Sequence, residues 1–240
     1  MKIVNAVWEK RNLGVDCNEI TISPDDSLET IKDEISKYET EYTVVKIPTG
    51  NIEALFLFQK LGYCFIETLT VCYHTGEDFN LNKIQKRILE KITYHKMNND
   101  DIDHLFKEIK QGMFQTDRIS MDPYFSTVQA NQRYIYWIND ELDRGSQLYK
   151  ISYNCKDIGF FALKKLTDTE YFAFLSGNYL EYLSSGLGFC AFYCEVTEAK
   201  RQGAKRVVGS YSSNNRGTTA ILLSIGHILR MQYYVFVKHN

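Results

Sequence analysis

Three consecutive stretches in the second half of the chain most constrain its fold: a strongly apolar run at 171–177, a loop of small residues at 184–189, and apolar residues at helical spacing over 189–199. Gly203 stands where that helix should end. A strand, a small-residue loop and a helix in this order predict an anion site, because backbone N–H groups can approach a phosphate there and the helix N-terminus adds a positive dipole. Two glycines alone more often mark a tight turn, so the order of the three elements carries this interpretation.

Charge and hydropathy exclude several classes of protein. The 240 residues carry a net charge of -2 with no dominant basic patch, which argues against nucleic acid as the main partner. No apolar run has the length of a signal peptide core or of a membrane span. We therefore expect a cytoplasmic protein without a membrane partner.

The cysteines predict packing rather than chemistry. No two of the six cysteines have Cys-x-x-Cys spacing, and the histidines do not cluster with them. We expect buried, reduced thiols and no metal site.

The first 80 residues predict a small β/α unit. Strands are expected at 17–23, 42–47 and 65–73, and helices after Ser27 and from Asn51 to Lys60. The last strand is long and apolar, so we expect it to be central in a sheet. Residues 81–90 are more polar and are interpreted as a linker with a short helical segment.

Residues 91–240 predict a larger α/β unit. Its first strand should lie at 91–96, and the cluster from Asn98 to Asp101 should begin a helix. A second helix is expected at 131–142 after an irregular stretch at 117–127. Two strands around the turn at 154–157 suggest a hairpin. The strand, loop and helix described first then follow, with a strand at 205–211, a short helix ending at Gly226, and a last strand at 233–238.

With this element order, the larger unit resembles the GNAT superfamily of N-acetyltransferases. The segment from Ser185 to Gly188 resembles the end of the acetyl-CoA motif Gln/Arg-x-x-Gly-x-Gly/Ala, and residues 203–208 resemble the passage into the fifth strand. Asn215, eleven residues before Gly226, resembles the spacing across the following helix. The resemblance implies an α/β fold with a mixed sheet, in which a GNAT-like domain follows a smaller unit that could be a degenerate half of the same fold.

Motifs in both units resemble bipartite TDP-fucosamine acetyltransferase-like proteins. They are 46–51, 61–63 with Glu67, 122–125 and 133–137. The implied activity is direct transfer of an acetyl group from acetyl-CoA to a primary amine, with an amino-deoxysugar nucleotide as the acceptor.

The resemblance also implies a cofactor site. A backbone N–H of the strand around Leu175 and Gly177 would polarise the thioester carbonyl. The loop would hold the pyrophosphate, and Asn215 would either bind pantetheine or only cap its helix. The implied cofactor-binding residues are Leu175, Gly177, Ser184, Ser185, Gly186, Leu187, Gly188, Phe189 and Asn215.

Two positions depart from the family pattern. Leu183 stands where the motif has Gln or Arg, and Leu222 stands where a tyrosine usually protonates the leaving thiolate. Tyr211 and Tyr233 are the catalytic candidates that remain, with Tyr234 beside them, although aromatic strand residues are usually core.

The acceptor site is less specified. Asp122, Tyr124 and Arg133 would line one wall, and Glu181 lies near the mouth of the expected cleft. Glu181 and Glu195 are possible bases, but glutamates on helices and loops are more commonly solvated. His227 is expected to be exposed.

Two other functions remain open. One is acetylation of an amino acid, polyamine or peptide amine. The other is acyl-CoA binding without catalysis, because Leu222 replaces the usual proton donor. The sequence leaves the oligomeric state open, a homodimer included.

Overall fold

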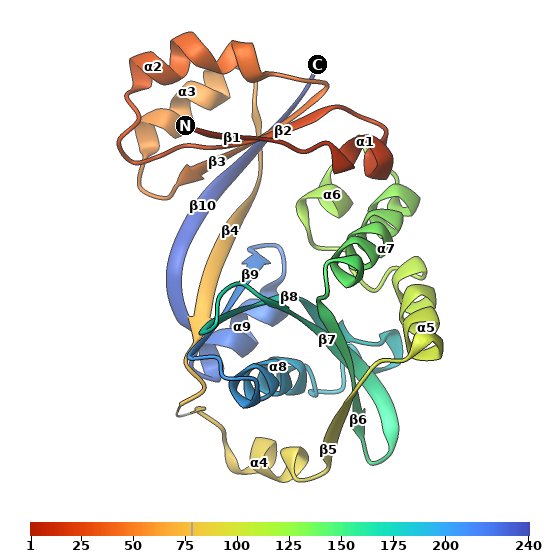
Figure 1. Cartoon of the computed structure of the whole chain (residues 1–240). Helices are drawn as coiled ribbons and strands as arrows, with labels where there is room; N and C mark the ends of the chain where they lie inside the picture. The colour runs from red at the N-terminus through yellow and green to blue at the C-terminus, as the bar shows by residue number, and fades with distance from the viewer. Residues whose placement is uncertain (78) are drawn as a thin grey trace.

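The computed structural model describes residues 1–77 and 79–240. Ten strands of this part form one mixed sheet (Figure 1). The strands are β1 (Lys2–Asn5), β2 (Cys17–Thr21), β3 (Tyr42–Pro48), β4 (Cys64–His74), β5 (Ile92–Lys96), β6 (Gln147–Tyr153), β7 (Lys156–Lys165), β8 (Glu170–Asn178), β9 (Arg206–Ser212) and β10 (Ile228–His239). The helices are α1 (Trp8–Leu13), α2 (Leu28–Glu34), η1 (Ile35–Tyr38), α3 (Ile52–Lys60), α4 (Lys83–Leu89), α5 (Asn99–Lys110), α6 (Arg118–Met121), α7 (Thr127–Asp143), η2 (Leu180–Tyr182), α8 (Phe189–Arg201) and α9 (Arg216–Ser224).

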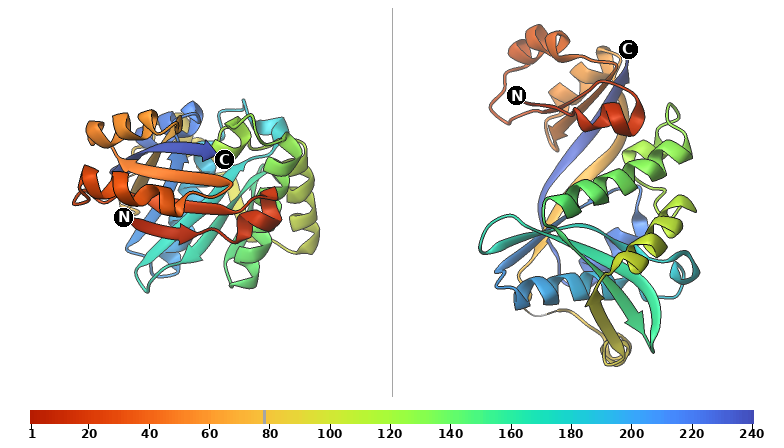
Figure 2. Two further views of the ribbon diagram at one scale, coloured as in Figure 1. Left: turned by 90° about the horizontal axis from the view of Figure 1, so that it is seen from above. Right: turned by 45° about the vertical axis from the view of Figure 1, so that its right-hand side comes forward.

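The sheet interleaves strands from the two ends of the chain. Its order is β1-β2-β3-β10-β4-β9-β8-β7-β6-β5, so β10 lies between β3 and β4 and is antiparallel to both. The long strands β4 and β10 join an upper body that carries α2 and α3 to a lower body that carries α8 and α9 (Figures 1 and 2). The expected α/β fold with a mixed sheet and the central position of β4 are confirmed. The sheet is continuous past residue 80, and the division into units stays a prediction.

The two faces of the lower sheet have different helical cover. Alternate residues of a strand point to opposite faces. Phe161 and Leu163 of β7 pack in a core cluster with α8, whereas Phe160 and Ala162 pack in a cluster with α5 and α7. This places α8 behind β8 and β9, with α5 and α7 on the opposite side. No helix of the described residues is long and apolar enough to cross a membrane.

Local sequence signals set most helix starts. Ser27, Asn51 and Asn98 accept hydrogen bonds from the first-turn amides of α2, α3 and α5, as expected for N-cap residues. Asn98 forms a capping box in which the side chain of Asp101 accepts from the Asn98 amide.

Asn98→Ala should lower the free energy of unfolding by about 1 kcal/mol, because the Asp101 amide in the first turn of α5 loses its partner. Urea denaturation measures this change. Asn99→Ala, at the next exposed position, is the matched control and should have little effect. Equal midpoints for the two variants would contradict this role of the cap.

Several features were not anticipated. Neither β1 nor α1 has an evident sequence signal, and the stretch at 117–127 that was expected to be irregular contains α6. The expected hairpin turn is present, with positive φ at Asn154 and Cys155. All six cysteines are free thiols, but Cys64 and Cys155 are exposed, so burial was correct for only the other four.

Candidate functional site

The sheet opens between β8 and β9. These parallel strands pair from Glu170↔Arg206 to Ala173↔Gly209, and the pairing then stops. The register of β7 and β8 shifts between the pairs Leu163↔Ala173 and Ala162↔Leu175, so Phe174 is an extra residue in β8. Such a β-bulge bends its strand, here at the point where the pairing with β9 ends. Beyond Ala173 the edge of β8 that faces β9 therefore has no strand partner, and its backbone polar groups are available to a ligand.

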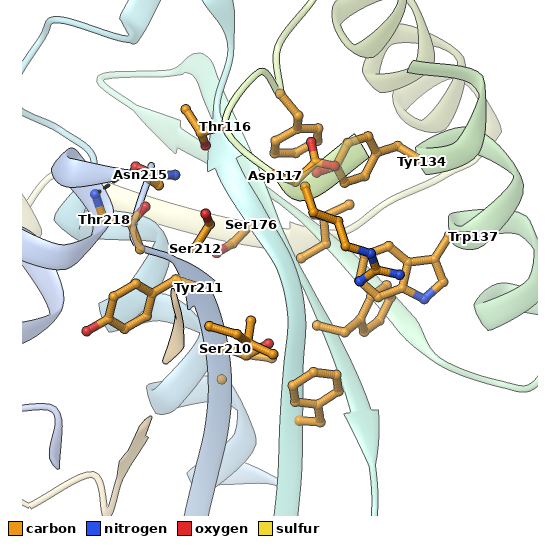
Figure 3. Close-up of a pocket in the computed structure, with 18 of the residues that line it drawn as sticks. Thr116, Asp117, Tyr134, Trp137, Ser176, Ser210, Tyr211, Ser212, Asn215 and Thr218 are labelled. Carbon is orange, nitrogen blue, oxygen red and sulfur yellow. Dashed lines mark hydrogen bonds between the residues drawn. The ribbon is translucent and has the colours of Figure 1, made fainter. Parts of the chain in front are cut away.

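A cavity of about 520 Å³ occupies this opening and reaches toward the strands of the N-terminal half. In Figure 3, Ser176 and the β9 residues Ser210, Tyr211 and Ser212 lie opposite Asp117, Tyr134 and Trp137. The walls include Glu19, Lys46, Glu67, Asp117, Arg118, Arg133, Tyr134, Trp137, Phe174, Leu175, Ser176, Glu195, Tyr211, Asn215, Leu222 and His227.

The structure brings some of the sequence-predicted residues to this cavity. Leu175, Tyr211 and Asn215 line it, and so do Arg133 and Leu222. Asn215 also caps α9, since its side chain accepts from the Thr218 amide at 3.0 Å. Burial raises the pKa of the Tyr211 hydroxyl, which therefore stays protonated at neutral pH.

Other predicted residues lie elsewhere. Tyr233 lies in β10 between Pro48 and Leu69 of the neighbouring strands and does not line the cavity. Glu181 is exposed in η2, and Gly177 packs against Met113 and Phe114.

Asp122 and Tyr124 belong to a separate contact. The buried carboxylate of Asp122 lies 2.8 Å from Nε2 of His239, and the Tyr124 ring stacks on that imidazole with centroids 3.8 Å apart. This contact ties the segment after α6 to the end of β10, and neither residue lines the cavity.

The loop at 184–188 is a compact turn before α8. Gly186 has φ +77°, a conformation that a side chain would strain, and the Ser185 hydroxyl accepts from the Leu187 amide. Among the described residues, the amides of Gly186, Gly188 and Phe189 donate to no acceptor. A Cβ on Gly188 would lie 2.9 Å from Cδ1 of Ile221, so the loop approaches α9 closely. The three free amides at the start of a long helix suit an anion.

Glu195 is the main residue that sequence reasoning placed wrongly. It was expected on a solvated surface, but it is 3% exposed in α8, lines the cavity, and has no hydrogen-bond partner for Oε2. Burial raises its pKa to about 8, so this carboxyl is largely protonated at neutral pH. Its spacing was a usable signal, since Ala191 and Ala199, one helical turn away on either side, are core residues.

His227 was also expected to be exposed, but it is half-buried and lines the cavity. Burial lowers its pKa to about 3, and the neighbouring His74 ring, with centroids 5.0 Å apart, adds to this. His227 is therefore neutral at physiological pH.

Ion pairs cover the wall formed by the N-terminal half. Glu19 accepts from Lys46 at 2.8 Å and also bonds Arg118. Burial alone would raise the pKa of Glu19, but these two cations hold it below its usual range. Arg133 binds the fully buried Glu9 through Nε and Nη2. Each basic group on this wall thus contacts a protein carboxylate, but Lys46 and Arg118 share the single charge of Glu19.

No family model matches the chain, and no curated protein matches it. Solved structures do. A GCN5-related N-acetyltransferase from Sphaerobacter thermophilus is 13% identical, with 99% of this chain and 75% of that chain covered at a TM-score of 0.62. The fold is that of the GCN5-related N-acetyltransferases, or GNAT fold.

Two further matches extend this GNAT likeness. One is a GCN5-related N-acetyltransferase from Kribbella flavida, with 12% identity, 93% and 81% of the two chains covered, and a TM-score of 0.55. The other is a tandem GNAT protein from the clavulanic acid biosynthesis pathway, with 8% identity, 93% and 75% covered, and a TM-score of 0.56. The α/β GNAT fold expected from the sequence is confirmed, and the three matches cover 93–99% of this chain.

Proposed function

We propose that this protein is an acetyl-CoA-dependent N-acetyltransferase that transfers the acetyl group directly to a primary amine. The observation that carries the proposal is the separation of β8 and β9 after Ala173↔Gly209, with a cavity in the opening and α8 behind it, in a GNAT fold. A thioester and an amine held in line in such a cleft gain much of their rate from positioning.

The residues present fit coenzyme A. The free amides of Gly186, Gly188 and Phe189 would hold the pyrophosphate, and the unpaired edge of β8 at Leu175 would bind the pantetheine arm. Acetyl-CoA supplies an activated acyl group, and a backbone N–H of β8 would polarise its carbonyl.

Proton transfer must differ from the usual family arrangement, because Leu222 cannot donate a proton. Tyr211 is the better of the two tyrosine candidates, since it lines the cavity and Tyr233 does not. The protonated Glu195 lines the same cavity, as does Ser176 of β8. These two groups are therefore the candidates for holding a proton near the thioester.

For the acceptor, the sequence resemblance predicts an amino-deoxysugar nucleotide, as in TDP-fucosamine acetyltransferase-like proteins. A nucleoside diphosphate requires uncompensated positive charge. Every lysine and arginine of the cavity wall is already engaged by a carboxylate: Lys46 and Arg118 share Glu19, Arg133 binds Glu9, and Arg144 binds Glu141. This favours the alternative acceptors, an amino acid, a polyamine or another small amine.

Saturating acetyl-CoA should raise the melting temperature, because a ligand at about 100 times its Kd stabilises the folded state by about 2.7 kcal/mol. Differential scanning fluorimetry measures this shift, with buffer alone as the blank and adenosine, which lacks the thioester and the pyrophosphate, as the control. An unchanged melting temperature would count against the proposal. Binding of acetyl-CoA without thiol release across an amine panel would favour the non-catalytic acyl-CoA-binding function that Leu222 suggests.

A further inference from the structure

Glu67 is a buried carboxylate that no cation neutralises directly. It lies in β4, is 4% exposed, and lines the cavity. Its Oε2 has no hydrogen-bond partner in the described part of the chain, and it forms no ion pair there. Burial raises its pKa, while a Ser212 hydroxyl and the charges of Arg118 and Lys46 favour the ionised form. A buried polar group in this state is costly unless something binds it.

Apart from Glu195, the other carboxyl groups of the cavity wall already have partners. Glu19 binds Lys46 and Arg118, Asp140 binds Arg11, and Glu141 binds Arg144 and Lys164. Asp117 accepts from the Ile119 and Ser120 amides at the start of α6. Glu67 is therefore the position where an additional positive charge is most favoured.

The wall beside it suits the body of a small amine. Phe174 and Trp137 lie with ring centroids 5.5 Å apart, and Tyr134 lies 6.3 Å from Trp137. Trp137 and Tyr134 share one side of the cavity with Asp117 (Figure 3). Aromatic faces bind apolar groups and also attract cations. In contrast, every lysine and arginine that lines this cavity, within the residues described, already contacts a carboxylate.

We propose that Glu67 binds the ammonium group of the acceptor, and that the acceptor is a small cationic amine that carries no phosphate. This inference rests on the proposed acetyl transfer and specifies its second substrate. Its structural consequence is that β4, a strand of the N-terminal half, supplies the anchor for the acceptor, while β8 and α8 of the C-terminal half serve the cofactor.

The test is calorimetric titration of the whole chain, with coenzyme A present, against four probes: phenylethylamine, putrescine, leucine and a nucleoside-diphosphate amino sugar. One of the first two should bind most tightly. Glu67→Gln should weaken that binding by about tenfold or more, because the desolvated charge pair is lost while the side-chain shape is kept. Glu53→Gln, at an exposed position of α3, is the matched control and should bind like the wild type.

A second measurement keeps the test independent of any effect of the substitution on folding. The fully N-acetylated form of the best probe, acetylated on both nitrogens in the case of putrescine, has the same carbon body without any positive charge, and it should bind the wild-type protein at least about tenfold more weakly. Equal binding of the charged and neutral forms, equal binding by wild type and Glu67→Gln, or preference for the nucleoside-diphosphate probe would each overturn the inference.

The outcome separates this inference from the proposed function. Binding of a cationic amine that depends on Glu67, without an acetyl-CoA shift, would leave the acceptor site standing and reject the transferase. An acetyl-CoA shift with acetylation of only phosphate-bearing amines would support the transferase and reject the role of Glu67.

Discussion

Arg133→Met should lower the free energy of unfolding by about 3–5 kcal/mol, because it leaves the fully buried carboxylate of Glu9 without its cation. Arg133 donates to Glu9 from both Nε and Nη2, whereas Asn12 offers only one weaker bond at 3.3 Å. Since α1 contacts the rest of the molecule mainly through α7, the loss should loosen this helix first. Denaturant unfolding measures the free energy.

The double variant Glu9→Gln with Arg133→Met should recover much of this loss, because it no longer buries an unpaired charge. Lys37→Met breaks the exposed pair with Glu34 and should change stability little. If Arg133→Met were as mild as Lys37→Met, or if the double variant were no more stable than the single one, the pair would not be a structural anchor. In that case the sequence-based prediction that Arg133 binds the acceptor would again be favoured.

Glu195 should make the protein less stable as the pH rises from about 5 to about 8. The folded-state pKa is about 8, above the usual value of 4.5, so folded Glu195 keeps a proton that the unfolded chain has released. Its stabilising contribution is complete below pH 4.5 and is lost as the pH rises toward 8, at up to about 1.4 kcal/mol for each pH unit.

Glu195→Gln should remove this dependence, because glutamine is neutral at every pH and nearly the same shape. Urea unfolding at about pH 5, 6.5 and 8 should therefore give a flatter profile for Glu195→Gln than for the wild type. Glu53→Gln should follow the wild-type profile, since Glu53 is exposed. Parallel profiles for Glu195→Gln and the wild type would mean that the carboxyl ionises normally in the folded state.

Local structure was predictable because its causes lie within a few residues. The side chains of Ser27, Asn98 and Asn215 each accept a hydrogen bond from an amide three positions further along the chain. The alternation of apolar residues likewise predicts strands from the local sequence alone. The small-residue loop before α8 was predictable for the same reason, since Gly186 adopts a positive φ that its sequence permits.

The site was less predictable because its causes are long-range. Glu195 was expected to be solvated, and only the tertiary structure shows that it is buried together with Glu9 and Glu67. The pairing of β10 with both β3 and β4 likewise depends on strands far apart in the chain, which periodicity cannot specify.

The position of β10 has a consequence for how the chain folds. Strands β3 and β4 are made early, but they share no ladder, and both pair with β10 instead. Until β10 is available, β3 and β4 each present an open edge, and neither half of the sheet can be completed. Folding must then wait for contacts of high sequence separation, which slow the search and expose unpaired strands to other chains. Chaperone protection of nascent chains should matter more for this topology than for one in which neighbouring strands pair in order.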